Sequence, residues 1–186
     1  VCSSDLAHRV VDCIEARAKG IFHIDMRLRP HGDAGPWSTA FDQLEAYYAP
    51  DGLAAPFELQ ALIKLRWVGG DEELGRRVES VRDAFSYSGA PWNWENAIHL
   101  RRRQMQELVR AGQINVKYSA GGLIDIEYTV QYLQLLNGLS HPEVRDSNTM
   151  AALARLRQLQ IVRESDYEHL HNSYVFLRKV IDALRL

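Results

Sequence analysis

The sequence predicts an α+β fold in which helices predominate. Residues 21–28 alternate between polar and apolar side chains with a period of two, as a half-buried strand does. From residue 56 onward, apolar residues recur at spacings of three and four, which is typical of amphipathic helices. We therefore expect one or two strands with their helices, followed by a helical bundle.

The N-terminal part is expected to hold the strand between two helices. Its elements are a helix at 7–18, the strand at 21–28 and a helix at 39–49. Gly20 stops the first helix, and the Pro- and Gly-rich sequence after the strand indicates a loop. Ser38 is the expected N-cap of the next helix, because its hydroxyl can accept a backbone N–H of the first turn.

The rest of the chain is predicted to be helical. The expected helices lie near residues 56–68, 71–86, 92–111, 121–137, 148–160 and 166–186. Ser165 and Glu168 have the spacing of a capping box at the start of the last helix.

Two domains are predicted. The opening residues, 1–6, resemble a translated sequencing-adapter tail and are interpreted as an artefact. With a hinge around 50–56, residues 7–52 form a first domain and residues 53–186 a helical bundle domain. The absence of an initial Met and of a cap after the last helical pattern predicts a fragment of a longer protein.

Composition and charge exclude several classes of protein. The 186 residues are 46% hydrophobic and 25% charged, and the formal net charge is −2, so no general attraction to nucleic acid is expected. No apolar run approaches the roughly 20 residues of a membrane span, and no signal peptide pattern is present. The two cysteines give neither a metal motif nor a disulfide framework. We expect a cytoplasmic protein that binds neither nucleic acid nor membrane.

One carboxylate and two arginines stand in or beside the predicted strand. Asp is disfavoured inside a strand, so Asp25 needs a compensating interaction. An ion pair with Arg27 or Arg29 would supply one. Mg²⁺ would supply another, because it binds carboxylate oxygens together with substrate phosphates, which guanidinium groups also bind. From these residues alone, a surface salt bridge and a metal–nucleotide site both remain open.

Four blocks of sequence follow one another along the chain. They are "IDMRLRP" with "GDAGP" and then "YY", "FELQALIKLRWVGGD" at 57–71, "VKYSAGGLIDIEYTVQYLQL" at 116–135 and "YVFLRKVIDALRL" at 174–186. In this order they resemble the glutamine synthetase adenylyltransferase/deadenylylase family of the nucleotidyltransferase superfamily. The first block resembles the deadenylylating half, but "GGLIDIEY" resembles the adenylylating half, so the direction of the reaction stays open.

The resemblance implies a fold and a chemistry. The superfamily core is a small mixed sheet with three metal-binding carboxylates, and Asp25 falls at the third position. The first two belong to a G-S…D-x-D motif that these residues lack, so we expect a partial nucleotidyltransferase core that is inactive by itself. The implied reaction transfers AMP from ATP to a tyrosine of glutamine synthetase, or removes it with inorganic phosphate, using two Mg²⁺ ions. A PII-type signalling protein is a further expected partner.

The resemblance also assigns roles to other residues. Arg27, Arg29 and Lys64 would bind the nucleotide or its phosphates, while Glu58 and Arg66 would face the nucleotide or the neighbouring domain. For Glu58, Lys64 and Arg66, a solvated helix face is the alternative. The family usually has Trp before Glu58, where this chain has Phe57, and we interpret the smaller ring as a packing change.

Three charged residues belong to the third block. Lys117 is expected to contact phosphate or to pair with Glu127. Asp125 stands in the first turn of its helix, where the helix dipole favours a carboxylate, so a capping role competes with a place near the catalytic cleft. Asp125 and Glu127 are two positions apart on a helix and point in different directions, so at most one of them can bind a metal.

Other interpretations remain open. Arg101 to Arg103 are expected to form a solvated basic face rather than a nucleic-acid platform, because interleaved aromatic residues are missing. The closest rival function is a uridylyltransferase that modifies a nitrogen-signalling protein. A third interpretation is a helical regulatory or scaffold module without catalysis.

Overall fold

The computed structural model describes residues 3–17, 24–26, 28–90 and 93–184. Within them it contains eight α-helices, two short 3₁₀-helices and no strand. The elements are α1 (Ser3–Arg17), η1 (Gly32–Ala34), α2 (Phe41–Tyr47), α3 (Glu58–Leu62), α4 (Glu72–Ser86), α5 (Trp94–Leu108), α6 (Leu123–Asn137), η2 (Pro142–Val144), α7 (Thr149–Gln158) and α8 (Glu164–Leu184). The prediction of a mainly helical chain is confirmed.

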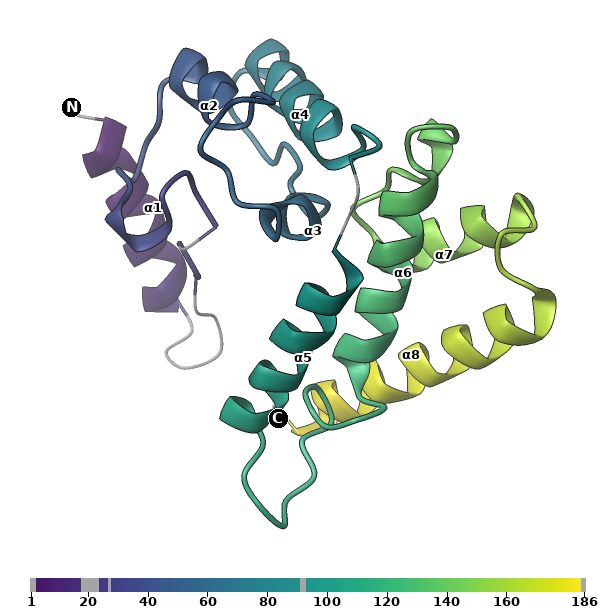
Figure 1. Ribbon diagram of the computed structural model, residues 1–186. Coiled ribbons are helices and arrows are strands. Elements are labelled where there is room, and N and C mark those ends of the chain that lie inside the picture. The colour runs from purple at the N-terminus through teal and green to yellow at the C-terminus, as the bar shows by residue number, and fades with distance from the viewer. Residues whose placement is uncertain (1–2, 18–23, 27, 91–92, 185–186) are drawn as a thin grey trace.

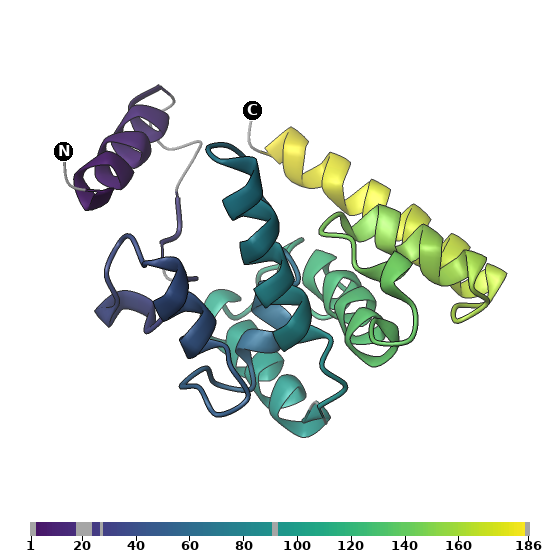
Figure 2. The ribbon, with the colours of Figure 1, turned by 90° about the horizontal axis from the view of Figure 1, so that it is seen from above.

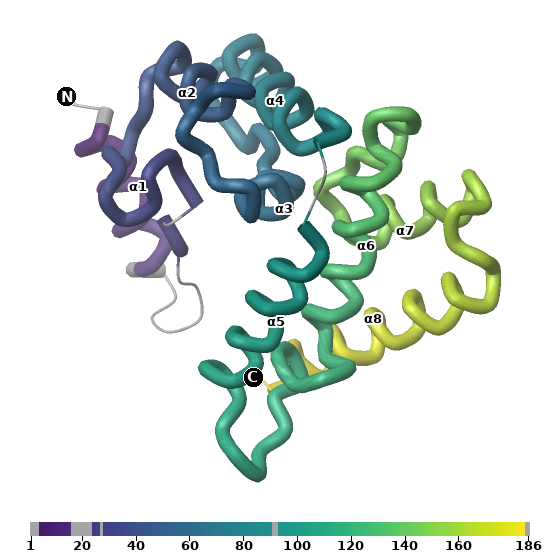
Figure 3. The backbone as a smooth tube through the Cα atoms, viewed as in Figure 1, coloured from purple at the N-terminus to yellow at the C-terminus, as the bar shows by residue number. Residues whose placement is uncertain are grey.

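Most of the helices form two groups (Figure 1). In Figures 1 and 2, α2, α3 and α4 lie together, α6, α7 and α8 form a second group, and α1 stands apart from that second group. The tube in Figure 3 shows the segment between α5 and α6 projecting beyond the ends of both helices. No described helix is both long enough and apolar enough to cross a membrane.

The first hydrophobic cluster lies where α6, α7 and α8 meet. Val130 of α6 and both Leu153 and Leu156 of α7 are completely buried. Tyr167 and Leu170 of α8 pack against this cluster. Full burial of one such aliphatic side chain contributes about 1.5–3 kcal/mol, so this cluster fixes the three helices against one another.

Two further clusters connect the other helices. In one, Tyr47 and Tyr48 at the end of α2 pack with Leu62 of α3. In the other, Ile63 packs with Leu135 of α6. The short α3 of the first group therefore also contacts the second group, and one buried cluster includes residues from both sides of the predicted hinge.

Side-chain caps begin three of the predicted helices. An oxygen of the N-cap side chain accepts backbone N–H groups of the first turn at 2.7–3.1 Å in α4, α5 and α7. The capping residues are Asp71, Asn93 and Asn148. Asp and Asn are among the preferred residues at this position, which explains why these helices start close to their predicted positions.

The strand predicted at 21–28 is wrong at every position that the structure describes. Residues 24–26 and 28 form a loop, whereas residues 21–23 and 27 lie outside the described residues. A strand needs a neighbouring strand for its backbone hydrogen bonds, and none of the described segments supplies one. The backbone N–H of Ile24 instead donates to Glu15 Oε1 at 3.2 Å.

Two predicted caps are also wrong. Ser38 lies two residues before the N-cap of α2, which is Ala40 and makes no side-chain cap, and the Ser38 hydroxyl lies 3.3 Å from that of Ser4. Ser165 lies inside α8, which already begins at Glu164.

The helix expected at 56–68 is much shorter, because the backbone that follows α3 bonds to α4. Arg82 donates to the Leu65 carbonyl at 2.6 Å, and the N–H of Trp67 donates to Glu79 at 2.8 Å.

Candidate functional site

The loop after Asp25 is organised by one arginine side chain. Arg29 donates from Nε to the Gly35 carbonyl at 3.2 Å and from Nη2 to the Asp33 carbonyl at 3.3 Å, and Nη1 donates to the Met26 carbonyl. Such bonds to backbone carbonyls satisfy acceptors that no secondary structure pairs. Arg29 therefore stabilises the loop that it belongs to, besides lining the pocket described below.

Asp25 is an exposed loop residue. No three His, Cys, Asp or Glu side chains within the described part of the chain come together as a metal-binding group. Arg27 lies outside the described residues. The described residues thus do not form a complete metal site.

Glu58 joins α3 to the end of α2. Its carboxylate accepts the hydroxyl hydrogens of Tyr47 at 2.9 Å and Tyr48 at 3.3 Å, together with the backbone N–H of Ala55 at 2.9 Å. Burial raises the pKa of both tyrosines, and the negative charge of Glu58 raises them further, so both phenols remain protonated donors at neutral pH. The solvated face considered for Glu58 is therefore wrong, because its oxygens hold a buried corner.

A pocket of about 660 Å³ lies beside this corner. Its lining includes four of the residues singled out in the sequence: Arg29, Glu58, Lys64 and Arg66. The volume falls within the usual range of small-molecule sites, about 300–1,000 Å³. Three cations and one carboxylate make the lining suitable for an anion.

Lys64 reaches from this pocket to the second helix group. Its ammonium donates to the Ser147 carbonyl at 3.0 Å and to the Thr149 hydroxyl at 2.6 Å, at the start of α7. Burial lowers the pKa of Lys64, while the charges of Glu127 and Asp146 oppose that shift. Lys64 therefore connects α3 to α7, a role that its position in the sequence did not reveal.

Arg66 differs from the other two pocket cations. It is exposed, and no described residue makes a hydrogen bond or ion pair with it. Its guanidinium group is thus available to an anion that enters the pocket.

The third sequence block lies outside this pocket. Asp125 Oδ1 accepts from Arg101 Nε at 2.6 Å, and Asp125 Oδ2 accepts from the N–H of Gly121 at 2.7 Å. Asp125 thus has the predicted helix-start role. The ammonium of Lys117 lies 5.0 Å from the centre of the Tyr118 ring, and no ion pair joins it to Glu127, so the predicted pairing of these two residues is wrong.

Arg101 is an important residue that sequence reasoning missed. Its side chain is only 13% exposed, and its Nη2 donates to the carbonyls of Tyr118 and Ser119 at 2.9 and 3.2 Å. The solvated basic face predicted here is wrong for this residue. A signal was present, because Arg101 lies three residues after Ile98 and four before Met105, on the apolar stripe of α5 itself.

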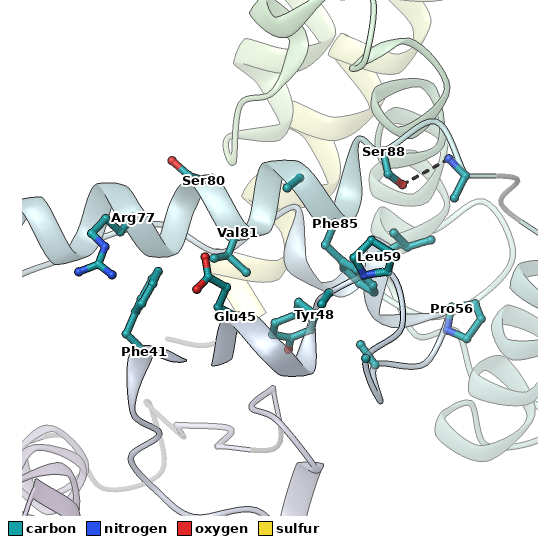
Figure 4. Close-up of a pocket in the computed structure, with 16 residues that line it drawn as sticks. Phe41, Glu45, Tyr48, Pro56, Leu59, Arg77, Ser80, Val81, Phe85 and Ser88 are labelled. Atoms are coloured by element: carbon teal, nitrogen blue, oxygen red, sulfur yellow. Dashed lines mark hydrogen bonds between the residues drawn. The ribbon is translucent and has the colours of Figure 1, made fainter. Parts of the chain in front are cut away.

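A second pocket, of about 840 Å³, lies between α2 and α4 (Figure 4). The guanidinium carbon of Arg77 lies 3.9 Å from the centre of the Phe41 ring, and Glu45 and Tyr48 line the same hollow. None of the site residues predicted from the sequence lines this pocket, whereas Arg29, Glu58, Lys64 and Arg66 line the smaller one; Asp25 lines neither. We therefore place the candidate site at the pocket lined by Arg29, Lys64 and Arg66.

Comparisons with known proteins place the chain near enzymes of nitrogen metabolism. Residues 2–81 match the model of glutamate-ammonia ligase adenylyltransferase, and residues 96–186 match that of GlnD PII-uridylyltransferase. A protein of Methylococcus capsulatus named bifunctional glutamine synthetase adenylyltransferase/adenylyl-removing enzyme is 34% identical over 97% of the chain, and its Nitrosococcus oceani namesake is 33% identical over 97%. A Streptomyces coelicolor protein of the same name is 34% identical over 88% of the chain. The chain spans only 19% of the first two relatives and 17% of the third.

Proposed function

The chain belongs to the family of bifunctional glutamine synthetase adenylyltransferase/adenylyl-removing enzymes, and we propose that the protein that contains it controls glutamine synthetase by reversible transfer of AMP. AMP would pass from ATP to a tyrosine of the synthetase, or inorganic phosphate would remove it. The observation that carries this proposal is the relatedness of nearly the whole chain to proteins whose names state both activities. The direction that this segment serves stays open.

The cationic pocket is the proposed binding place of the phosphoryl group. Arg66 has no other described partner. A guanidinium group has five N–H donors and an ammonium has three. Arg29 makes three hydrogen bonds and Lys64 two, so each retains at least one donor for a phosphate oxygen. For Arg27 and Lys117, the proposed phosphate contact rests on the family resemblance alone.

Asp25 is the proposed metal-binding carboxylate. When bound, Mg²⁺ offsets charge on the phosphate oxygens. Because the described residues do not form a complete metal site, we derive no step through the ion. Asp25 is exposed, and in this proposal other carboxylates of a longer protein would hold the same ion.

The remaining acids are proposed to support the site without contacting the reacting atoms. Glu58 already accepts three hydrogen bonds and is therefore poorly placed to act as a base. Asp125 fixes the start of α6, and Glu127 stabilises the charged form of Lys64. The division into a partial nucleotidyltransferase core at 7–52 and a bundle at 53–186, and a cytoplasmic location, belong to the same proposal.

One observation favours a second candidate. The match of residues 96–186 to the PII-uridylyltransferase model supports uridylyl transfer, with UTP as donor and a PII-type protein as target. The relatedness of nearly the whole chain to adenylyltransferases favours AMP. A PII-type protein remains a proposed regulatory partner in either case.

The proposal is tested with the full-length gene product that contains this sequence, compared with its Asp25→Asn variant. Each protein is incubated with glutamine synthetase, labelled ATP and Mg²⁺, and separately with adenylylated synthetase and phosphate. We expect Asp25→Asn to abolish one direction and leave the other, because each catalytic half would have its own carboxylates. Asp42→Asn, a change of another carboxylate in the N-terminal part of the chain, serves as the control and should retain both activities.

Either of two results would contradict the proposal. Unchanged activity of Asp25→Asn in both directions would remove Asp25 from the site. Uridylylation of a PII-type protein by the unsubstituted enzyme, without any adenylylation of the synthetase, would establish the second candidate instead.

A further inference from the structure

The Lys64 ammonium is held by groups that lie outside the cationic pocket. Lys64 lines that pocket, but its two hydrogen bonds run to the Ser147 carbonyl at 3.0 Å and to the Thr149 hydroxyl at 2.6 Å. Thr149 is the first residue of α7 and lines neither of the two pockets described above. One cation of the candidate site therefore takes its position from a helix that the sequence did not connect with the site.

The segment that supplies these two acceptors is itself held by a buried side chain. Gln134 of α6 is completely buried. Its side-chain amide donates to the carbonyls of Val144 at 2.7 Å and Asp146 at 2.8 Å, in the segment just before α7. Thr149 is only 4% exposed. Buried polar groups that are hydrogen-bonded in this way favour a single geometry, so the acceptors of the ammonium have defined positions.

The hydrogen bonds at α7 fix the direction of the remaining ammonium donor. An ammonium group has three N–H donors, and two of them are used at α7. The carbon stem of a lysine is flexible. Fixing the ammonium of Lys64 before an anion arrives therefore removes part of the entropy cost of binding that anion. The loss of either acceptor would return this freedom to the side chain.

We propose that Thr149 is a positioning residue of the phosphate site: its hydroxyl and the Ser147 carbonyl hold the Lys64 ammonium with its remaining N–H toward the pocket. This inference rests on the proposed function, in which the pocket binds the phosphoryl group of ATP or inorganic phosphate. Thr149 contacts no substrate in this proposal and acts through Lys64 alone. Anion binding by the pocket therefore depends on the docking of α7 against the residues that follow α3.

The kinetic test compares Thr149→Val with Ser86→Ala in the full-length protein. Both residues are 4% exposed, and the Ser86 hydroxyl donates to the Leu59 carbonyl at 3.0 Å, so each change removes one buried hydroxyl and its hydrogen bond. We expect Thr149→Val to raise KM for ATP or phosphate about tenfold, the scale of one hydrogen bond to a charged group, with kcat and KM for glutamine synthetase unchanged. Thr149→Ala, which adds no methyl group to the buried site, should raise it as well.

Two variants separate positioning from a general loss of stability. Thr149→Ser keeps the hydroxyl and should retain the low KM for ATP or phosphate. Ser86→Ala should also retain it, because a loss of folded protein lowers the apparent kcat and leaves KM unchanged. An unchanged KM in Thr149→Val, or the same rise in Ser86→Ala, overturns the inference.

A second readout is acetylation of Lys64 by acetic anhydride, measured by mass spectrometry, which reports on this one residue without glutamine synthetase. ATP or phosphate should protect Lys64 in the unsubstituted protein, and Thr149→Val should need about tenfold more of the same anion for equal protection. Equal protection at equal concentrations overturns the inference. If the anion protects Lys64 in this Thr149-dependent way but the enzyme transfers AMP in neither direction, the proposed function fails and the inference stands. If neither anion protects Lys64 in the unsubstituted protein, the phosphate site and the inference both fail.

Discussion

The Arg101 side chain links the start of α6 to the loop before it. It joins Asp125 at the start of α6 to two carbonyls of the preceding loop, the loop that also carries Lys117. A lysine could not replace it, because only the forked guanidinium reaches a carboxylate and two carbonyls at once. Arg101 therefore positions Lys117 indirectly, whatever Lys117 binds.

Replacement of this side chain is expected to loosen the loop. Arg101→Met keeps most of the aliphatic stem but removes the guanidinium, leaving the Asp125 carboxylate and two carbonyls without this partner. We expect backbone amides in 115–121 to exchange hydrogen about tenfold faster, equivalent to about 1.4 kcal/mol of local stability. Hydrogen-exchange mass spectrometry measures this rate. Arg102→Met, at an exposed neighbouring position, is the control, and equal exchange in both variants would contradict the prediction.

At the scale of elements, the connection between α3 and α7 depends on Lys64. The ammonium group makes two hydrogen bonds at the start of α7, and Asn148 caps the same helix end. A cation near a helix N-terminus is unfavourable for the dipole, so its bonds to Ser147 and Thr149 and the nearby acids must offset that cost. This arrangement predicts a structural role that is separable from phosphate binding.

A double-mutant cycle tests this role. Lys64→Met and Thr149→Val each remove one side of the 2.6 Å hydrogen bond, so their effects on unfolding free energy should not add. We expect a coupling energy of about 1 kcal/mol from urea unfolding. Lys64→Met should also raise KM for ATP or phosphate if the lysine binds phosphate as well. Additive effects on stability, with a coupling near zero, would contradict the structural role.

The helices could be predicted from sequence because their evidence is local. Apolar spacing and capping residues such as Asp71 and Asn148 lie within the helix or next to it. The strand could not be predicted reliably, since a strand depends on a partner segment that a period-two pattern does not reveal. The pocket could not be predicted reliably from the sequence either. Arg29, Glu58 and Lys64 were identified one by one, but the sequence did not show that their partners are backbone groups and hydroxyls.

At the scale of the whole molecule, the described residues form a helical scaffold, and the proposed catalytic centre is expected to need residues of a longer protein. Two helix groups are joined through α3, and residues between Leu28 and Val68 line the cationic pocket. The described residues contain no cluster of three metal-binding side chains, whereas the proposed reaction uses two ions held by several carboxylates. When this segment is studied alone, we therefore expect it to keep the cationic pocket but to lack catalysis.

This separation gives the last prediction. The isolated 186-residue chain should neither adenylylate glutamine synthetase with labelled ATP and Mg²⁺ nor remove AMP from it with phosphate. Circular dichroism must first show that the isolated chain is helical, and the full-length protein in the same assay serves as the positive control. Measurable transfer by the isolated chain would mean that its own residues complete the catalytic centre, and Asp25 would then not be one of three carboxylates completed from elsewhere. Absence of transfer by a folded chain is the expected result, because the described residues bring no three metal-binding side chains together.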